Sequence, residues 1–341
     1  MNIDAYSHVF HIPLSDALAE VSPTAELSAL RSQSPYIHDA DKRIAFMDEH
    51  GFDIQVLVLA RPPVWLGMER AALHRMVRVA NDSIAAFARR HPSRFIGVGV
   101  IPVVDDVMME EYDRALDELG LAGVLIFTNI EGLPLDDESM WPLYARAAER
   151  GSPIWIHPQH ANLYPWLGKD VLDRTLAWPF DTSLAMARLV YGGVFEEYPD
   201  ITFMTHHMGG MIPYFANRID AFSRSTRKEY AKLGLGGSGG AELSVPAIEH
   251  FRRFHNDTVS NGSVECLSMA RNFFGTERLL FGTDFPFGPP SGSWAVDEKH
   301  ALEAFDISAA DREAIFHGNA ERMLGLRGER DAATTAATDA K

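Results

Sequence analysis

Residues 279–287, LLFGTDFPF, form the stretch that decides the fold of this 341-residue chain. A short apolar run is followed by a glycine, an acidic residue and a proline that ends the run. Apolar strands of this kind are usually buried on both faces and belong to parallel sheets. Asp284 therefore lies where a buried strand ends and a loop begins. A carboxylate there is costly to desolvate unless a metal or a cationic group meets it, and the alternative is an ordinary helix cap or turn residue.

Strand-like and helix-like segments alternate along the whole chain. The eight predicted strands cover residues 2–10, 53–60, 94–102, 122–128, 153–157, 201–206, 254–260 and 278–283. The predicted helices cover residues 39–50, 69–90, 106–119, 138–150, 182–198, 211–232, 264–274 and 308–326, whereas residues 11–38 are predicted to be a long connection. This alternation predicts an α/β fold, a single-domain (β/α)8 TIM barrel over residues 1–326, with inserted loops after strands 1, 5 and 6. Residues 327–341 are predicted to be a disordered tail.

Composition and charge exclude several classes of protein. The net charge of −16 argues against binding to nucleic acid or to an anionic membrane surface, although local arginines still permit a small carboxylate substrate. The single cysteine, Cys266, excludes an internal disulfide and a cysteine-rich zinc site. The N-terminus lacks the features of a signal peptide, and no apolar run reaches the about 18–20 residues of a membrane span. We therefore expect a cytoplasmic protein.

Histidines stand at the ends of several predicted strands. In a (β/α)8 barrel, catalytic groups come from the C-terminal ends of the strands, so side chains at these positions meet at one face. A single histidine there is more often a packing or surface residue, but several together with an aspartate predict a site. Neutral imidazoles and a carboxylate are the usual ligands of a catalytic Zn²⁺ or a similar ion. The residues concerned, on strands 1, 5, 6 and 8, are His8, His157, His206, His207 and Asp284.

Five short motifs in this order resemble the amidohydrolase superfamily. They are IDAYSH (3–8), WIHP (155–158), THHMGG (205–210), LLFGTDFPF (279–287) and HGNAERMLGL (317–326). The resemblance is to the branch of metal-dependent decarboxylases typified by the enzymes that act on aminocarboxymuconate semialdehyde, resorcylate and carboxyvanillate. It implies a carbon–carbon lyase for a small aromatic or unsaturated carboxylic acid. It also implies a divalent metal, with Zn²⁺ favoured and Mn²⁺ as the alternative, and a homodimer.

The resemblance assigns roles residue by residue. His8, His157 and Asp284 match the family's metal ligands on strands 1, 5 and 8, and the eighth-strand aspartate also moves a proton. His207 matches the sixth-strand histidine that contacts metal-bound water or substrate, which makes Asp284 and His207 the predicted catalytic residues. His206 is the weaker candidate on strand 6, because the family pattern places its histidine two residues before the glycine pair, and we assign it to substrate binding.

Three further residues are predicted to bind substrate: Arg43, Trp166 and Tyr6. Arg43, within DADKRIAFMD (39–48), matches an arginine that holds a substrate carboxylate in the family, and a bidentate guanidinium suits that task. The alternative is a solvated helix charge. Trp166 belongs to a group of aromatic residues in the loops after strands 2 and 5, which form either a pocket wall or loop packing. The others in this group are Trp65, Tyr164 and Trp178.

Tyr6 departs from the family pattern. The first strand usually carries His-x-His, and here it carries Tyr6-Ser7-His8. A neutral phenol is a poor metal ligand, so Tyr6 hydrogen-bonds a ligand, binds as phenolate, or marks a weakened or absent metal site. His8, His157 and Asp284 alone are enough for an open catalytic site, which favours a metal over a metal-free acid/base cluster. A hydrolase or hydratase, and a non-catalytic binding protein, are the alternative functions.

Overall fold

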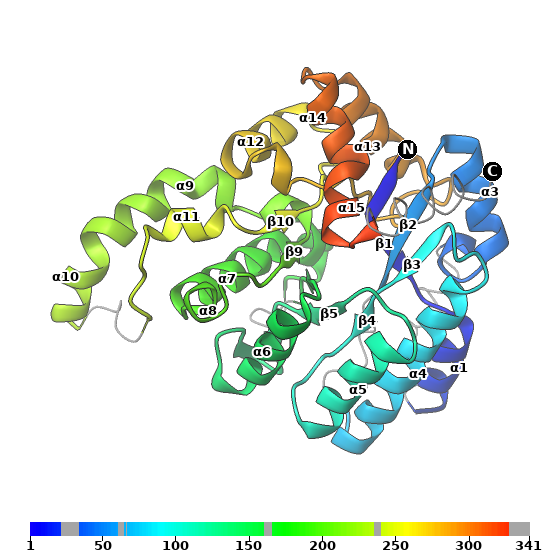
Figure 1. The fold of residues 1–341 in the computed structure, drawn as a ribbon, viewed down its shortest axis with the longest axis horizontal. Helices are drawn as coiled ribbons and strands as arrows, with labels where there is room; N and C mark the ends of the chain where they lie inside the picture. The colour runs from blue at the N-terminus through cyan, green and yellow to red at the C-terminus, as the bar shows by residue number, and fades with distance from the viewer. Residues whose placement is uncertain (22–33, 61–64, 66, 160–165, 235–239, 327–341) are drawn as a thin grey trace, which may run out of the picture.

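A closed barrel of parallel strands forms the centre of the computed structural model, which describes residues 1–21, 34–60, 65, 67–159, 166–234 and 240–326 (Figure 1). Its strands are β1 (Ile3–Val9), β2 (Ile54–Leu59), β3 (Phe95–Gly97), β4 (Gly99–Val100), β5 (Val124–Phe127), β8 (Ile154–His157), β9 (Phe203–Thr205) and β10 (His255–Asn256). β1, β2 and β3 pair in one sheet, and β4, β5, β8, β9 and β10 pair in that order in a second. β3 and β4 are consecutive parts of the third barrel strand and join the two sheets.

Residues 279–283 close the barrel, as the eighth predicted strand requires. Leu279 bridges to Asn256 in parallel, and the amide of Ala5 donates to the carbonyl of Phe281 at 2.7 Å. The quoted stretch therefore lies between the last and the first strands. The predicted (β/α)8 barrel is confirmed.

Helices alternate with the strands and pack around the barrel (Figure 1). They are α1 (Ile12–Val21), α3 (Ala40–His50), α4 (Arg70–Ala88), α5 (Asp106–Asp117), α6 (Trp141–Arg150), α7 (Trp178–Tyr191), α8 (Val194–Glu197), α9 (Ile212–Ala221), α10 (Arg227–Lys232), α11 (Ala247–Phe251), α12 (Val264–Phe274), α13 (Ser293–Ala304), α14 (Ala309–Glu313) and α15 (Asn319–Met323). A small hairpin, β6 (Asn129–Ile130) and β7 (Leu133–Pro134), follows β5. α9 and α10 extend away from the barrel (Figure 1).

Local sequence signals set the ends of α3, which carries Arg43. The Asp39 carboxylate accepts hydrogen bonds from the amides of Asp41 and Lys42, and so caps the free N–H groups of the first turn. Gly51 ends the helix in the left-handed conformation, with φ of 70°. Arg43 lies on the face of α3 that is buried against the barrel.

Three of the described helices, α1, α11 and α13, were not predicted from the sequence. α1 occupies part of the predicted connection over residues 11–38, because Leu14 and Leu18 are one turn apart and bury a short apolar face. Pro13 sits in the first turn of α1, where its missing N–H costs no hydrogen bond. α11 is a short helix of five residues, and α13 has a weak amphipathic pattern. The predicted tail, 327–341, and residues 22–33 lie outside the described residues. Among the described helices, none combines the length and the apolar character needed to cross a membrane.

Glu298 on α13 gives the fold a pH dependence. Its buried carboxylate accepts hydrogen bonds from the amides of Ser260 and Gly262 and from the Ser260 hydroxyl. Burial raises the pKa of Glu298 from 4.5 to about 7 in spite of these donors. A raised folded-state pKa stabilises the fold below the unfolded-state value, and this contribution is lost as the pH rises toward 7, at about 1.4 kcal/mol per unit of pKa difference.

We expect Glu298→Gln to weaken the decline of the unfolding free energy between about pH 4.5 and 7, measured by urea denaturation at several pH values. Glu303→Gln, at an exposed position of the same helix, is the matched control and should keep the wild-type profile. Identical pH profiles for Glu298→Gln and wild type would contradict this account.

Candidate active site

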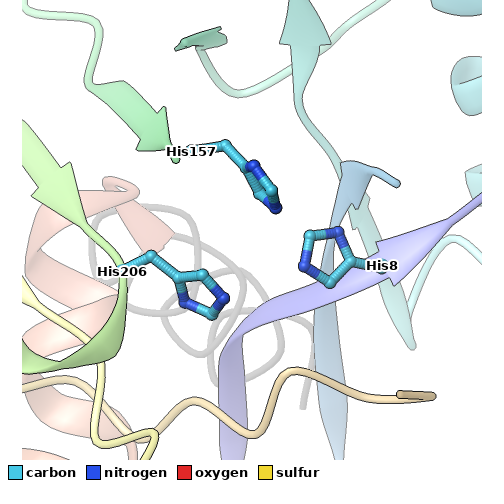
Figure 2. Close-up of side chains that lie close together, drawn as sticks. All are labelled: His8, His157 and His206. Carbon is cyan, nitrogen blue, oxygen red and sulfur yellow. The ribbon is translucent and has the colours of Figure 1, made fainter. Parts of the chain in front are cut away.

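Three histidine rings converge at the C-terminal ends of β1, β8 and β9. Figure 2 shows His8, His157 and His206 turned toward a common space from three different strands. The ring centroids are 5.2 Å apart for His8 and His157, 5.9 Å for His8 and His206, and 5.7 Å for His157 and His206. One ring nitrogen of each lies within 4.8 Å of the others, and all three side chains are buried. This geometry is that of a metal-binding group.

Asp284 completes this cluster from the end of the eighth strand. Its Oδ1 atom lies 2.9 Å from Nε2 of His8 and 3.3 Å from Nε2 of His206. The Asp284 side chain is 20% exposed, in contrast to the buried histidines. The cluster is therefore accessible to solvent at Asp284. Asp284 also has a φ of 59°, in the left-handed region that non-glycine residues rarely adopt. The strand-end histidines and the aspartate predicted from sequence therefore do meet.

Burial and mutual proximity set the protonation states of the cluster. Burial alone would raise the pKa of Asp284. The facing His206 and His8 together lower it by more than burial raises it, so the pKa of Asp284 falls well below its usual range. Burial lowers the pKa of His8, and it lowers the pKa of His157 well below its ordinary value with help from the neighbouring His8 and His206. A carboxylate and neutral imidazoles are the forms in which these side chains bind metals.

Asp257 orients His206 and was not predicted from sequence. Its Oδ2 atom contacts Nδ1 of His206, and its Oδ1 atom accepts hydrogen bonds from the amides of Met208 and Val259. Burial lowers the pKa of His206, but Asp257 and Asp284 raise it to about 9. Carboxylates behind ligating histidines commonly fix the ring in this way. In the structure Asp257 directly follows β10 and so occupies the same strand-end position as the other site residues, whereas the predicted seventh strand, residues 254–260, placed it in mid-strand.

His207 lies beside the cluster, and His206 lies within it. The chain turns into the left-handed region at His207, with φ of 56°, so that its ring centroid lies 3.7 Å from that of His206. Burial and the neighbouring His206 lower the pKa of His207 to about 3. One His207 nitrogen still lies within 4.8 Å of ligand atoms of His206 and Asp284. The structure thus joins His206 with His8 and His157, and places His207 next to Asp284.

Tyr6 supports the His206 ring. The two rings are stacked with centroids 4.1 Å apart and planes 9° apart, and the phenol donates to the carbonyl of Ile156 at 3.2 Å. Burial raises the pKa of Tyr6 well above its ordinary value, and Asp257 and Asp284 add to this effect. A neutral phenol engaged with backbone fits a packing role beside the site better than that of a phenolate ligand.

Arg43 and Trp166, the two other residues predicted to bind substrate, differ in their exposure to solvent. Arg43 is fully buried, and its guanidinium donates to the Gln55 side chain and to the carbonyl of His8, each at 2.6 Å. Its partners are protein groups, and it is not the solvated charge considered as the alternative. Trp166 is 52% exposed, and its contact with substrate stays a prediction.

Aromatic side chains border the histidine cluster. Trp178 packs edge-on to His157 with centroids 5.8 Å apart, and Phe287 packs against His8 at 5.0 Å. Phe127 lies 6.2 Å from His157, with Trp65 beyond it at 6.5 Å from Phe127. An apolar wall around a polar centre is typical of a small-molecule pocket. Tyr164, named from sequence for the same wall, lies outside the described residues.

The residues present fit a divalent metal. Nε2 of His8, Nε2 of His206 and Nδ1 of His207 are buried; among the described residues the first two face the Asp284 carboxylate at 2.9 and 3.3 Å without a well-formed hydrogen bond, and Nδ1 of His207 makes none. Buried polar atoms left in this way are rare and require an explanation. A divalent cation that accepts imidazole nitrogen and carboxylate oxygen supplies one.

Comparison with known proteins agrees with this geometry. The sequence profile of the amidohydrolase family matches residues 3–326. The chain is 30% identical to gamma-resorcylate decarboxylase of Polaromonas sp. over 89% of its own length and 92% of the relative. It is also 30% identical to 2-amino-3-carboxymuconate-6-semialdehyde decarboxylase of Dictyostelium discoideum, over 84% of its own length and 77% of the relative.

A solved structure and a more distant relative extend the comparison. The structure of dihydroxybenzoic acid decarboxylase from Polaromonas sp., with bound manganese and the inhibitor 2-nitroresorcinol, superposes with a TM-score of 0.77 at 25% identity. That match covers 96% of this chain and 97% of the other. 2-Keto-4-carboxy-3-hexenedioate hydratase of Sphingobium sp. is 24% identical over 95% of this chain and 96% of the relative.

We expect Tyr6→Phe to retain the metal content of the wild type, because the Tyr6 hydroxyl serves a backbone carbonyl. His157→Ala should lose most of it, since it removes one nitrogen of the cluster. Elemental analysis of the purified variants measures both. Loss of metal in Tyr6→Phe, with metal retained in His157→Ala, would reverse the roles given to these residues.

Proposed function

The chain belongs to the amidohydrolase family, and on that premise we propose that it is a metal-dependent carboxy-lyase that releases CO2 from a small aromatic or unsaturated carboxylic acid. One observation carries the proposal: a single oxygen of Asp284 lies 2.9 Å from His8 and 3.3 Å from His206 at the catalytic face of the barrel. That arrangement combines a metal-binding group with a carboxylate able to pass on a proton.

His8, His157 and Asp284 are the proposed metal ligands, with His206 next to them. Held by these residues, a divalent cation would supply Lewis-acid positive charge for binding a substrate carboxylate. We propose Zn²⁺, because two imidazoles and one carboxylate are a common catalytic zinc set. Mn²⁺ is the ion to compare with it in reconstitution, since a related structure contains manganese.

The chain's own residues supply the proton. Nδ1 of His206 faces Asp257, and its Nε2 lies 3.3 Å from Asp284, so a proton can pass from His206 to Asp284. Asp284 then donates it to the ring carbon that bears the carboxylate. The carbon–carbon bond breaks, CO2 leaves, and the electron pair of that bond restores the aromatic ring. His207, beside Asp284, is the proposed contact to the substrate.

The aromatic wall favours a flat substrate. Trp178 and Phe287 flank the histidines from two sides, and such rings stack on or pack against an aromatic acid. These features support an aromatic acid over an aliphatic one.

The alternative is a hydratase or hydrolase that uses the same residues, which the hydratase relative motivates. In that case Asp284 acts as the base that activates water, and the product gains solvent oxygen. A decarboxylase product instead gains one solvent hydrogen and no solvent oxygen. Isotope labelling therefore separates the two functions.

We expect the protein to release CO2 from at least one acid in a panel of hydroxybenzoates that includes 2,6-dihydroxybenzoate. In heavy water the product should carry one deuterium at the former carboxyl carbon. Asp284→Asn should lower kcat by at least about 100-fold through loss of the proton donor and of a metal ligand. The exposed Asp306→Asn serves as control. Solvent oxygen in the product without CO2 would establish the hydratase or hydrolase instead.

We also propose that the protein is a homodimer. Exposed apolar side chains lie just before and within the first half of α7 and at the start of α9; they are Leu176, Phe180, Leu184, Tyr214 and Phe215. The two parts are adjacent, because the amide of Met211 donates to the Ser183 hydroxyl at 2.7 Å. Monomers rarely expose contiguous apolar patches of this kind. Acidic and basic side chains, such as Asp220 and Arg218, occur together on α9, so the face is compatible with a second copy despite the net charge.

Light scattering coupled to size-exclusion chromatography should give twice the 37.9 kDa chain mass for the wild type. Phe180→Glu should give the monomer mass, because it places a charge in the centre of the apolar face. Val264→Glu, at an exposed position on α12, is the control and should stay dimeric. A monomeric wild type would reject the proposal.

A further inference from the structure

A chain of buried polar side chains lies beside the histidine cluster. It consists of Asp4 on β1, Gln55 on β2 and Arg43 on α3, and we call these three residues the relay. All three side chains are fully buried. The charges of Asp4 and Arg43 are joined through the amide of Gln55, which accepts from Nε of Arg43 at 2.6 Å and donates to Asp4 at 3.0 Å. Burying two charges in this way is costly, so a role beyond packing is expected.

One end of the relay holds the backbone of His8. Nη1 of Arg43 donates to the His8 carbonyl at 2.6 Å and to the Tyr36 carbonyl at 3.3 Å. The guanidinium also lies over the ring of Phe285, 4.9 Å from its centroid. Arg43 therefore contacts both the residue that carries a site imidazole and the residue that follows Asp284.

The other end of the relay holds the residue before Asp284. The Asp4 carboxylate accepts from the Thr283 hydroxyl at 2.6 Å and from the Thr283 amide at 3.1 Å. Thr283 and Phe285 are thus both fixed by members of the relay. The amide of His8 also donates to the carbonyl of Phe285 at 2.6 Å, which ties the two strand ends directly.

Asp284 needs such support because of its backbone conformation. A non-glycine residue with a φ of 59° is disfavoured and persists only where its surroundings hold it. The relay fixes both neighbours of Asp284 and, at the same time, the carbonyl of His8. Apolar side chains at this place would fill the space, but they would not fix the orientation of the His8 carbonyl or of Thr283 as these hydrogen bonds do.

We propose that Asp4, Gln55 and Arg43 are positioning residues that set the distance between His8 and Asp284, and with it the affinity of the site for its metal. Arg43 then acts on the site through the backbone of His8 and the ring of Phe285, in place of the substrate contact expected from sequence. The proposal deepens the proposed function, because it concerns the metal site on which that function rests. It does not depend on which acid is the substrate.

The test measures Mn²⁺ affinity by titration followed with electron paramagnetic resonance, alongside thermal unfolding. Thr283→Val removes the hydroxyl that meets Asp4 at nearly constant volume, and Gln55→Met interrupts the relay in its middle. Thr283→Ser keeps the hydroxyl and is the rescue variant. Tyr112→Phe is the control for a general loss of stability, because it removes a buried hydroxyl that contacts Ser152, just before the opposite end of β8.

We expect Thr283→Val and Gln55→Met to weaken Mn²⁺ binding by at least about 10-fold, as residues behind metal ligands commonly do. Thr283→Ser and Tyr112→Phe should bind like the wild type. If Gln55→Met does not fold, the Mn²⁺ affinity of Thr283→Val compared with that of Thr283→Ser is sufficient to test the proposal. Relay variants that melt at lower temperature but bind Mn²⁺ like Tyr112→Phe would overturn the proposal. A wild type that binds Mn²⁺ but decarboxylates no acid would reject the proposed function and leave this comparison valid.

Discussion

The contact of one Asp284 oxygen with both His8 and His206 is the interaction on which the site depends. It joins the first, sixth and eighth strands, which are far apart in sequence, and it exists only because the barrel closes between residues 279–283 and β1. The same contact sets the electrostatics. The facing imidazoles hold the pKa of Asp284 well below its usual range, and Asp284 together with Asp257 raises that of His206 to about 9. Closure of the barrel therefore brings Asp284 and the histidines together, and their contact in turn sets the protonation states of the site.

Most of the fold could be predicted, because its signals are local. Buried parallel strands appear in the sequence as apolar runs, and the two ends of α3 are indicated by the capping residue Asp39 and by Gly51. α1 was not predicted because its buried face consists of little more than Leu14 and Leu18. Two apolar residues one turn apart are too few to distinguish a helix from a loop in the sequence. α13 shows a similarly weak amphipathic pattern, so its packing is decided by the tertiary structure rather than by its own sequence.

The site was predictable in outline, since strand-end residues of a barrel share one face. Its details were not, because they depend on backbone turns and on pairs distant in sequence. The left-handed turn at His207 decides which of two adjacent histidines joins His8 and His157. Asp257 acts on a histidine 51 residues away, and Arg43 meets its partners only after β1, β2 and α3 have packed. Helical position alone cannot distinguish a buried arginine that supports a site from one that binds substrate.

The claim that this cluster is a metal centre can be tested most directly by diffraction from crystals of the protein reconstituted with Mn²⁺, using the anomalous signal of the ion. The account predicts one strong anomalous peak at the C-terminal face of the barrel, within bonding distance of imidazole nitrogens of His8 and His157 and of a carboxylate oxygen of Asp284. A fully loaded crystal with its peak elsewhere, or with no peak among these three side chains, would contradict it.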